Sequence, residues 1–450
     1  MKIERKFENN ETIEELTQFI RKAVTPFHTV QAVRELLTEH GFKEFNMEEP
    51  FEILRGGSYF ATVYESSLMA FTVGEDFQTA KARIRCTSSH TDFPGFKLKP
   101  ESKICMETGN GNCYIKCNTE VYGGPILNTW MDRPLSLAGR LVLKGENAFE
   151  QKDILVNVDY PVFVIPNLAI HMNREVNKGV ELNRQKDMLP LMAVLTDNVV
   201  IDVRRTDAVL DLLLGPALKE QGIRKDEILD YELFVYSFEN GQQIGLNGEM
   251  FLAPRLDNLT SVLAQTKALI QAKRENGLNV AMYFDHEEIG SRTKQGAASQ
   301  SMMLLMEKIY ASLGFDRQQL INDMLQGTMI SCDVAHAYHP NAPEKSDLTN
   351  RVMLNKGIVI KQAAGQSYAN DAYGVAMVKQ ICKENQIDYQ VFVNRSDMAG
   401  GQTLGAISST VMPFRTIDIG IPLLAMHSAR ELMGTKDQKN LEKFLTGYYS

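Results

Sequence analysis

An apolar run followed at once by four polar residues is the feature that most restricts how this chain can fold. Residues 280–284 are suited to a buried core strand, residues 285–288 read Asp-His-Glu-Glu, and Gly290 ends the segment. In open α/β sheets, residues just past the carboxyl end of a core strand face the crevice where ligands bind. Glu287 and Glu288 could there divide the work, one binding a metal ion and one acting as a general base. The alternative is a solvated acidic loop on the surface. Residues elsewhere in the chain must distinguish a functional site from such a loop.

Length and charge exclude several classes of protein. The 450 residues suffice for a large core and for more than one domain, or for one domain with a sizeable insertion. The net charge of -8 does not favour binding to nucleic acid or to an anionic membrane. The first ten residues are too charged for a signal peptide, and the longest nearly apolar run, residues 160–170, holds two prolines and is too short to span a bilayer. We expect a cytoplasmic, soluble protein.

The cysteines show no paired framework. They stand at positions 86, 105, 113, 117, 332 and 382. Such sparse cysteines are typical of reduced thiols in the cytosol. Cys113 and Cys117, with Cys105 nearby, could form a small metal site, but the spacing is poor for structural zinc and no second pair follows. We favour free thiols that are buried or half-buried.

The pattern of helices and strands predicts two kinds of domain. Helices are expected at residues 257–276, 298–313 and 368–384 and from Ser428 onward, and strands at 82–86, 280–284, 328–333, 389–393 and 416–420. This alternation predicts an α/β fold, with a mostly parallel sheet flanked by helices. From 97 to 245, short β-like runs dominate, among them 199–203, with one helical segment at 207–219. We predict a catalytic domain made of residues 1–96 and 246–450, with a β-rich domain, residues 97–245, inserted between them.

Polar residues follow several of the predicted core strands. His90 and Asp92 come after the strand at 82–86, Asp333 ends the strand at 328–333, and His427 lies in the loop after the strand at 416–420. Asp257 stands near the start of a helix, where it is either an N-cap or a carboxylate that bridges two cations. Singly, a surface or capping role explains each residue at least as well. Taken together, a surface role explains them less well. The ends of parallel strands lie along one edge of a sheet, so residues that follow these strands are expected to lie close to one another.

Together these residues predict a two-metal hydrolase. Two histidines and three carboxylates, namely His90, His427, Asp257, Glu288 and Asp333, suffice for two zinc ions with open coordination positions. Glu287 then remains as the base. Asp92 could accept a hydrogen bond from the second ring nitrogen of His90 and fix its tautomer. The same ligands also suit cobalt or manganese.

The sequence resembles the aspartyl aminopeptidases, a family of dinuclear zinc peptidases that assemble into tetrahedral dodecamers. The matching segments are residues 89–95 (SHTDFPG), 255–258 (RLDN), 285–291 (DHEEIGS), 333–341 (DVAHAYHPN) and 424–428 (LAMHS). They stand in the family's order and span most of the chain, and the interrupted domain layout matches as well. The resemblance implies an enzyme that removes N-terminal Asp or Glu from peptides. It also implies dimers that assemble into a dodecamer, with the inserted domain serving dimerisation or acting as a lid.

The resemblance assigns five metal ligands. Asp257 would bridge the two ions. His90 and Asp333 would complete one site, and Glu288 and His427 would complete the other. All five match the family's motifs position by position.

The same resemblance assigns the remaining catalytic roles. Glu287 would take a proton from the metal-bridging water and pass it to the leaving amine, while Asp92 would orient His90. His171, in the inserted domain, would donate to the oxyanion that develops during attack, in the active site of a neighbouring subunit. A metal-ligand role for His171 is the competing interpretation.

Substrate choice is less constrained by the motifs. A preference for acidic residues requires a cation in the pocket, and the family's lysine matches Lys361, with Lys356 as the nearby alternative; His339 is expected among the substrate-binding residues. Residues 394–401 read NRSDMAGG and depart from the Arg-Asn-Asp and Cys-Gly of many members. This departure leaves open a broad or neutral-residue aminopeptidase.

Two other classes of function remain as alternatives. A dinuclear deacylase or carboxypeptidase would need an arginine for a free carboxylate, and Arg395 and Arg415 are the candidates. A non-catalytic assembly protein is disfavoured, because scaffolding requires no general base.

Overall fold

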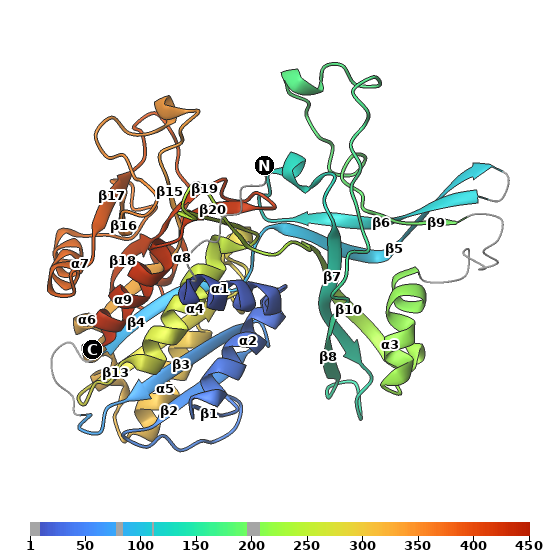
Figure 1. Cartoon of the computed structure of the whole chain (residues 1–450). Helices are drawn as coiled ribbons and strands as arrows, with labels where there is room; N and C mark the ends of the chain where they lie inside the picture. Colours follow the sequence, from blue (N-terminus) through green and yellow to red (C-terminus); the bar gives the residue numbers. More distant parts are fainter. Residues whose placement is uncertain (1–9, 78–83, 110–111, 196–207) are drawn as a thin grey trace. The chain divides into compact units, whose positions relative to one another are not determined.

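The computed structural model describes residues 10–77, 84–109, 112–195 and 208–450 (Figure 1). The chain separates into two compact units. The first comprises Met1–Phe93, Asn240–Met426 and Glu431–Ser450, and the second comprises Pro94–Glu239 and His427–Arg430. The second unit thus includes residues 427–430, which were predicted to lie in the catalytic domain. The predicted strand at 199–203 and the first residue of the predicted helix at 207–219 lie outside the described residues.

A nine-stranded sheet forms the centre of the first unit. Its order is β1 (Lys43–Glu44), β2 (Ser58–Val63), β3 (Ser67–Val73), β13 (Leu278–Phe284), β4 (Ile84–His90), β14 (Thr328–Cys332), β18 (Arg415–Gly420), β16 (Ile358–Gln362) and β17 (Tyr389–Val393). The four central strands, β13, β4, β14 and β18, are parallel to one another. β3 runs antiparallel to β13, and β16 runs antiparallel to β18. The predicted α/β class is confirmed, with a mixed sheet whose centre is parallel.

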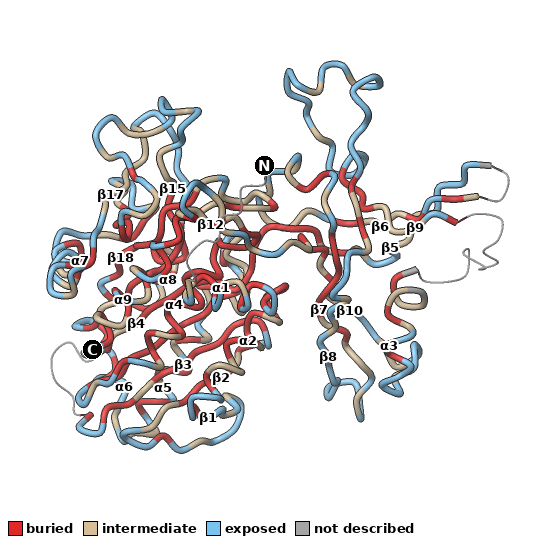
Figure 2. Tube along the Cα trace, in the orientation of Figure 1, coloured by how far each residue is buried: buried red, intermediate tan, exposed pale blue. Residues whose placement is uncertain are grey.

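Helices cover both faces of this sheet (Figure 1). One face packs against α1 (Glu11–Lys22), α2 (Pro26–Glu39), α4 (Leu256–Gln271), α7 (Ala372–Glu384) and α9 (Asp437–Tyr449), and the other against α5 (Ser301–Ser312), α6 (Arg317–Gln326) and α8 (Leu404–Ser408). Successive residues of a strand point to opposite faces. β13 therefore sends Ala281 and Tyr283 into one apolar cluster and Val280 and Met282 into the other. This burial on both sides explains its uninterrupted apolar sequence, and Figure 2 shows the central strands buried.

A smaller five-stranded sheet completes the first unit. Its order is β11 (Gln242–Ile244), β12 (Met250–Ala253), β20 (Glu431–Gly434), β19 (Pro422–Leu424) and β15 (Ala335–His336). The prediction that the last helix begins at Ser428 is wrong, because residues 431–434 form β20 and α9 begins at Asp437. β20 pairs with β12 on one side and β19 on the other, which satisfies its backbone groups in a buried position.

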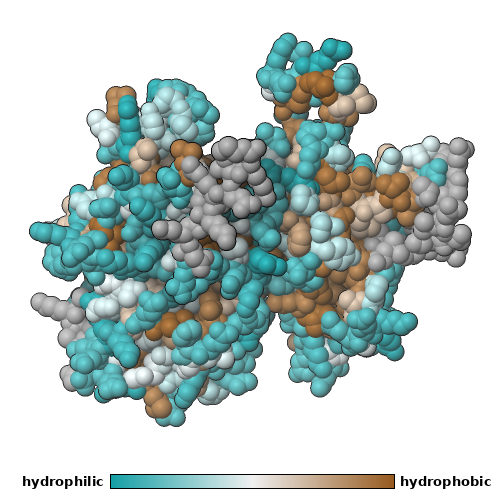
Figure 3. Space-filling model, viewed as in Figure 1, coloured by the Kyte–Doolittle hydropathy of each residue, from teal (hydrophilic) through white to brown (hydrophobic). Residues whose placement is uncertain are grey.

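The second unit is built on a six-stranded antiparallel sheet. Its order is β8 (Lys152–Asn157), β7 (Leu135–Leu143), β10 (Ile228–Ser237), β5 (Gly95–Gly109), β6 (Asn112–Tyr122) and β9 (Leu191–Leu195). Phe96, Trp130 and Leu137 belong to its apolar core. A π-helical segment, Ala208–Leu214, leads into the short helix α3 (Gly215–Glu220). Hydrophobic residues are visible on the surface of this unit in Figure 3.

No helix among the described residues combines the length and the apolar character that crossing a membrane requires.

A partly buried histidine in α2 makes the stability of the first unit depend on pH. Burial lowers the pKa of His28 to about 4, from 6.5. Because this base is protonated more readily in the unfolded chain, the stability present above pH 6.5 is lost as the pH falls toward the folded pKa. We expect His28 to account for a loss of about 2 kcal/mol in the free energy of unfolding between about pH 7 and about pH 5.

Urea denaturation of the wild type and of His28→Gln at these two pH values measures this contribution. The variant should lose less stability on acidification. An identical pH dependence in the two proteins would contradict the assignment.

Candidate metal centre

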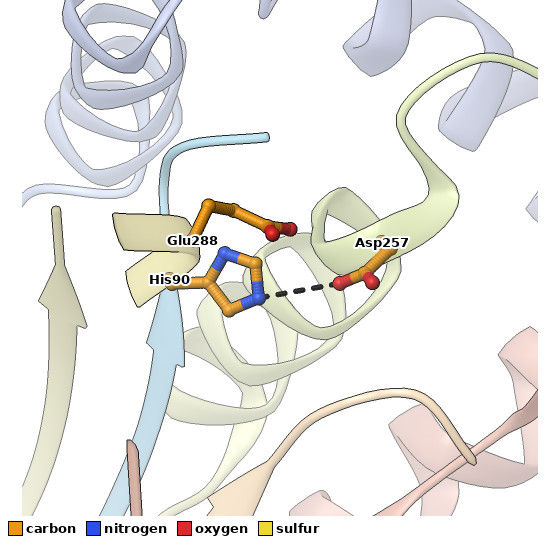
Figure 4. A group of neighbouring side chains, drawn as sticks. All are labelled: His90, Asp257 and Glu288. Carbon is orange, nitrogen blue, oxygen red and sulfur yellow. Dashed lines mark ion pairs between the residues drawn. The ribbon is translucent and has the colours of Figure 1, made fainter. Parts of the chain in front are cut away.

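The carboxyl ends of three neighbouring parallel strands bring polar residues to one edge of the large sheet. β4 ends at His90, β13 is followed by the acidic segment 285–288, and β14 is followed by Asp333. β4 lies between β13 and β14 and is parallel to both. Asp257 comes from the start of α4. Figure 4 shows the side chains of His90, Asp257 and Glu288 pointing toward one another.

The distances within this group suit a cation. His90 is only 1% exposed, and its Nε2 lies 3.2 Å from Oδ1 of Asp257 and 3.6 Å from Oδ1 of Asp333. One ligand atom each from His90, Asp257 and Glu288 lies within 4.8 Å of the other two. Burial alone would lower the pKa of His90, but the carboxylates of Asp257, Asp333 and Asp92 outweigh it and raise that pKa well above its usual value. The carboxylates therefore favour the protonated, positively charged form of the imidazole.

Asp92 holds the site together through two different groups. Its main-chain carbonyl oxygen lies 2.9 Å from Nδ1 of His90, whereas its carboxylate Oδ1 is 3.5 Å from the same nitrogen. The carboxylate accepts hydrogen bonds of 3.1 Å from the backbone N–H groups of Glu287 and Glu288. With Nδ1 donating to the carbonyl, Nε2 keeps the lone pair that a metal ion requires.

The acidic segment turns sharply after β13. His286 has a φ of 62°, in the left-handed region, and Glu287–Ile289 form a single 3-10 turn. Asp285 is buried and accepts a hydrogen bond of 2.7 Å from the backbone N–H of His286. Burial raises the pKa of Asp285 to about 8, and the charge of Asp92 adds to the shift. Burial likewise raises the pKa of Glu287 to about 8, against the opposing effect of the His90 charge.

Two residues without a predicted role anchor Asp257 and its surroundings. The backbone N–H of Asp257 donates to Oε2 of Glu431 at 3.0 Å, and Glu431 is 2% exposed. Asn258 Nδ2 donates to the carbonyl of Cys332 at 2.8 Å, which ties α4 to the end of β14. The peptide bond between Asp257 and Asn258 is cis. The position of Asn258 beside Asp257 was its only sequence signal, and Glu431 had none.

Lys361 lies against one of the candidate ligands. Its Nζ is 3.6 Å from Oδ2 of Asp333 and donates to the carbonyl of Val334 at 3.1 Å. The lysine is 2% exposed. Burial alone would lower the pKa of Lys361, but the charges of Asp333 and Asp418 raise it above its usual value. Lys361 is therefore a buried cation beside the carboxylates.

Two predicted site histidines belong to the second unit. The Nδ1 of His427 lies 3.1 Å from the carbonyl oxygen of Gly124, a distance at which an Nδ1–H can donate to that oxygen. His171 is exposed, in a segment of mostly exposed residues. Their approach to the residues of the first unit stays a prediction.

A cavity of about 270 Å³ lies in the first unit, next to β15 and β17. Its lining includes Tyr338, Val352, Phe392, Met398 and Met426. His339 is exposed and also lines it, and its Nδ1 accepts a hydrogen bond of 3.2 Å from Asn341 N–H, while its role in substrate binding stays a prediction. Arg395, another lining residue, is paired with both carboxylate oxygens of Asp397 at 2.6 and 2.9 Å. The cavity therefore combines apolar residues with charged and polar ones, among them Lys345 and Asp347, and its arginine already has an acidic partner.

Comparison with known families decides the class of this protein. Residues 19–449 match the family described as Aminopeptidase I zinc metalloprotease (M18). The chain belongs to the M18 family. Its donor set of one imidazole nitrogen and carboxylate oxygens within 4.8 Å of one another fits the zinc of these M18 enzymes.

Several relatives of this M18 chain are similar over nearly its whole length. A probable M18 family aminopeptidase 2 from Clostridium novyi (strain NT) is 44% identical over 436 residues, which cover 97% of this chain and 98% of the relative. Ape4, solved in complex with Nbr1, is 30% identical with a TM-score of 0.90 and covers 99% of this chain and 87% of its own. The mApe1 dodecamer of S. cerevisiae is 27% identical with a TM-score of 0.82, and covers 98% of this chain and 96% of its own. The prediction of a zinc metalloaminopeptidase is confirmed.

Asp92 should control the affinity of the site for zinc. In Asp92→Asn, an amide NH₂ replaces one carboxylate oxygen and faces the backbone N–H of either Glu287 or Glu288, which should shift the acidic segment. We expect zinc affinity to fall about 10–100-fold, as is typical when a residue that supports metal ligands is lost.

Competition with a chromophoric zinc chelator measures this affinity, and Asp76→Asn, at an exposed position, is the control. Equal affinities for Asp92→Asn and the control would show that Asp92 does not support the metal site.

Proposed function

We propose that this M18 aminopeptidase cleaves the N-terminal peptide bond by attack of a water molecule, with Glu287 as the general base. The observation that carries the proposal is the convergence of His90, Asp257 and Glu288 from three separate elements. Glu287 stands next to Glu288, and its backbone is held by Asp92. Bound zinc would supply a Lewis acid that polarises the peptide carbonyl and lowers the pKa of the attacking water.

Two metal ions with five protein ligands are proposed. His90 and Asp333 would hold one ion, Glu288 and His427 would hold the other, and Asp257 would contact both. The position of Asp257 supports this division, because its Oδ1 approaches His90 while its side chain also faces Glu288 (Figure 4). Cobalt or manganese would suit the same ligands.

The chain's own groups would carry the proton transfers. Glu287 takes a proton from the attacking water and returns it to the leaving amine, which is the ordinary duty of a general base. Asp92 positions both carboxylates of the acidic segment through their backbone N–H groups. His171 would donate to the oxyanion from a neighbouring copy, which requires a homo-oligomer of the kind named for mApe1. A dodecamer built from dimers and a cytoplasmic location stay predictions.

Replacing the proposed base should separate turnover from metal binding. Glu287→Gln keeps the backbone N–H that bonds to Asp92 and removes the proton acceptor, so kcat should fall by a factor of about 10² to 10⁴. The zinc content per chain should not change, because Glu287 is not a proposed ligand.

Turnover of a chromogenic aminoacyl substrate and elemental analysis give the two quantities. Glu275→Gln, at an exposed position, is the matched control. A wild-type rate would remove Glu287 from the base role, and a loss of zinc would make it a ligand instead.

Lys361 is the proposed selector of acidic N-terminal residues. Its ammonium group is a buried positive charge 3.6 Å from Asp333, a proposed ligand, and therefore close to where a substrate would bind. The alternative is a preference for neutral residues. That alternative is supported by the existing contacts of Lys361 with Asp333 and Val334, and by the apolar residues that line the neighbouring cavity.

Aspartyl, glutamyl, leucyl and lysyl substrates distinguish these preferences. If Lys361 pairs with the substrate carboxylate, Lys361→Met should lower kcat/KM for the aspartyl substrate about 10–100-fold, the value of a charged hydrogen bond, and change the leucyl value much less. Lys356→Met, at an exposed position, is the control. A leucyl preference in the wild type would replace the acidic specificity and leave the mechanism intact.

A deacylase or carboxypeptidase is less well supported. Such enzymes need a cation for a free substrate carboxylate, and both candidate arginines have acidic partners. Arg395 pairs with Asp397, and Arg415 lies 3.2 Å from Asp371.

A further inference from the structure

A fully buried aspartate on β18 has no role in the reaction described above. Asp418 is 0% exposed, and its Oδ2 accepts a hydrogen bond of 2.5 Å from the backbone N–H of Ala369. Ser331 stands opposite it on β14, and a β-carbon added to Gly405 of α8 would fall 2.9 Å from its Oδ1. A charge enclosed in this way is costly unless a cation compensates it.

Lys361 is a cation that faces Asp418 across two neighbouring strands. β16 and β18 are antiparallel, with Ile360 opposite Ile419. Both isoleucines belong to the apolar cluster on one face of the sheet. Lys361 and Asp418 each stand one residue beyond this pair, so their side chains point to the other face and are neighbours there.

The segment after β16 contacts the same two residues. Ala369 forms two hydrogen bonds with Asp418, since the backbone N–H of Asp418 also donates to the carbonyl of Ala369 at 2.9 Å. The preceding residue, Tyr368, has its ring centroid 5.2 Å from Nζ of Lys361. Lys361 and Asp418 therefore share one buried region.

The proposed zinc ligand Asp333 also contacts Lys361. Nζ of Lys361 lies 3.6 Å from Oδ2 of Asp333, and Oδ1 of the same carboxylate lies 3.6 Å from Nε2 of His90. Asp333 is thus placed between the candidate metal centre and a buried ammonium group. From the centre outward, the side chains of Asp333, Lys361 and Asp418 are negative, positive and negative.

A cation behind a metal ligand opposes metal binding. The charge of Lys361 attracts the carboxylate of Asp333 and repels a metal ion on its other side, and burial leaves little water to screen either effect. We propose that Asp418 is a positioning residue for the metal centre, whose carboxylate compensates the charge of Lys361 and so leaves the charge of Asp333 to the metal. The inference rests on the proposed role of Asp333 as a ligand.

The ionisation of the two groups agrees with this pairing. Burial alone would lower the pKa of Lys361, but the charges of Asp333 and Asp418 raise it above its usual value. Burial raises the pKa of Asp418, and the charge of Lys361 opposes that shift. Lys361 and Asp418 therefore each favour the charged form of the other.

Two substitutions separate charge compensation from ordinary packing. In Asp418→Asn, the amide keeps the shape of the side chain and its oxygen can still accept from Ala369, but the charge of Lys361 then acts on Asp333 alone. We expect zinc affinity to fall at least about tenfold. Adding Lys361→Met to Asp418→Asn removes the uncompensated cation, so the affinity should return close to the wild-type value. Lys361→Met alone should also bind zinc nearly as wild type, because a buried carboxylate without a cation is held neutral.

The experiment is competition for zinc between a chromophoric chelator and the full-length protein, as wild type and as these three variants. Asp323→Asn is the matched control, because Asp323 is also a buried aspartate of the first unit, 4% exposed and bonded to the hydroxyl of Tyr310 at 2.8 Å. It should bind zinc as wild type does. Asp333→Asn serves as the reference for loss of a ligand.

The variants distinguish failure of this inference from failure of the ligand assignment. Wild-type affinity in Asp418→Asn, or a double variant that binds zinc as weakly as Asp418→Asn, would overturn the inference while Asp333→Asn is impaired. Wild-type affinity in Asp333→Asn would overturn the ligand assignment and the inference with it. If Asp418→Asn does not fold, a double variant that folds and binds zinc as wild type supports charge compensation, and one that does not fold contradicts it.

Discussion

Several carboxylates converge on one buried imidazole, and this concentration of negative charge governs the chemistry of the first unit. Asp257, Asp333, Asp92 and Glu287 all act on His90, and together they raise its pKa despite burial. The excess of negative charge also affects Glu287, because burial and the neighbouring carboxylates raise its pKa to about 8. Buried like charges are costly unless a cation neutralises them. The negative charges of this site are therefore neutralised only when a metal ion is bound. Contacts other than those to the metal must hold these side chains in place before it binds.

Hydrogen bonds from outside the ligand set provide that support. The Asp92 carboxylate fixes the backbone of Glu287 and Glu288, and Glu431 fixes the backbone of Asp257. The parallel centre of the sheet supplies the rest, because β13, β4 and β14 end side by side and deliver their polar residues to one edge. Rigid strands and helices, and not a flexible loop alone, thus set the positions of Glu287 and Glu288, the proposed base and the proposed ligand.

The sequence predicted those parts that depend on local pattern. The apolar run of β13 and the polar residues after it indicated a buried strand and a site at its end, and the motifs around His90 and Asp257 indicated a metallopeptidase. Features that depend on distant pairing were missed. Glu431 reaches Asp257 across 174 positions, and β20 is a strand only because β12 and β19 flank it. For Asp92, the predicted carboxylate contact with His90 is longer than the contact of its carbonyl, which no side-chain motif can signal.

The place of the insertion has a consequence for how the protein is made. β13 lies between β3 and β4 in the large sheet, yet it follows them in sequence only after most of the second unit. During synthesis, β3 and β4 are made before β13, so neither can pair with β13 until residues 278–284 have been made. The antiparallel hairpin of β5 and β6 consists of near neighbours in sequence, and such local contacts form quickly. The hairpin of β5 and β6 can therefore pair before β13 is available to the central sheet.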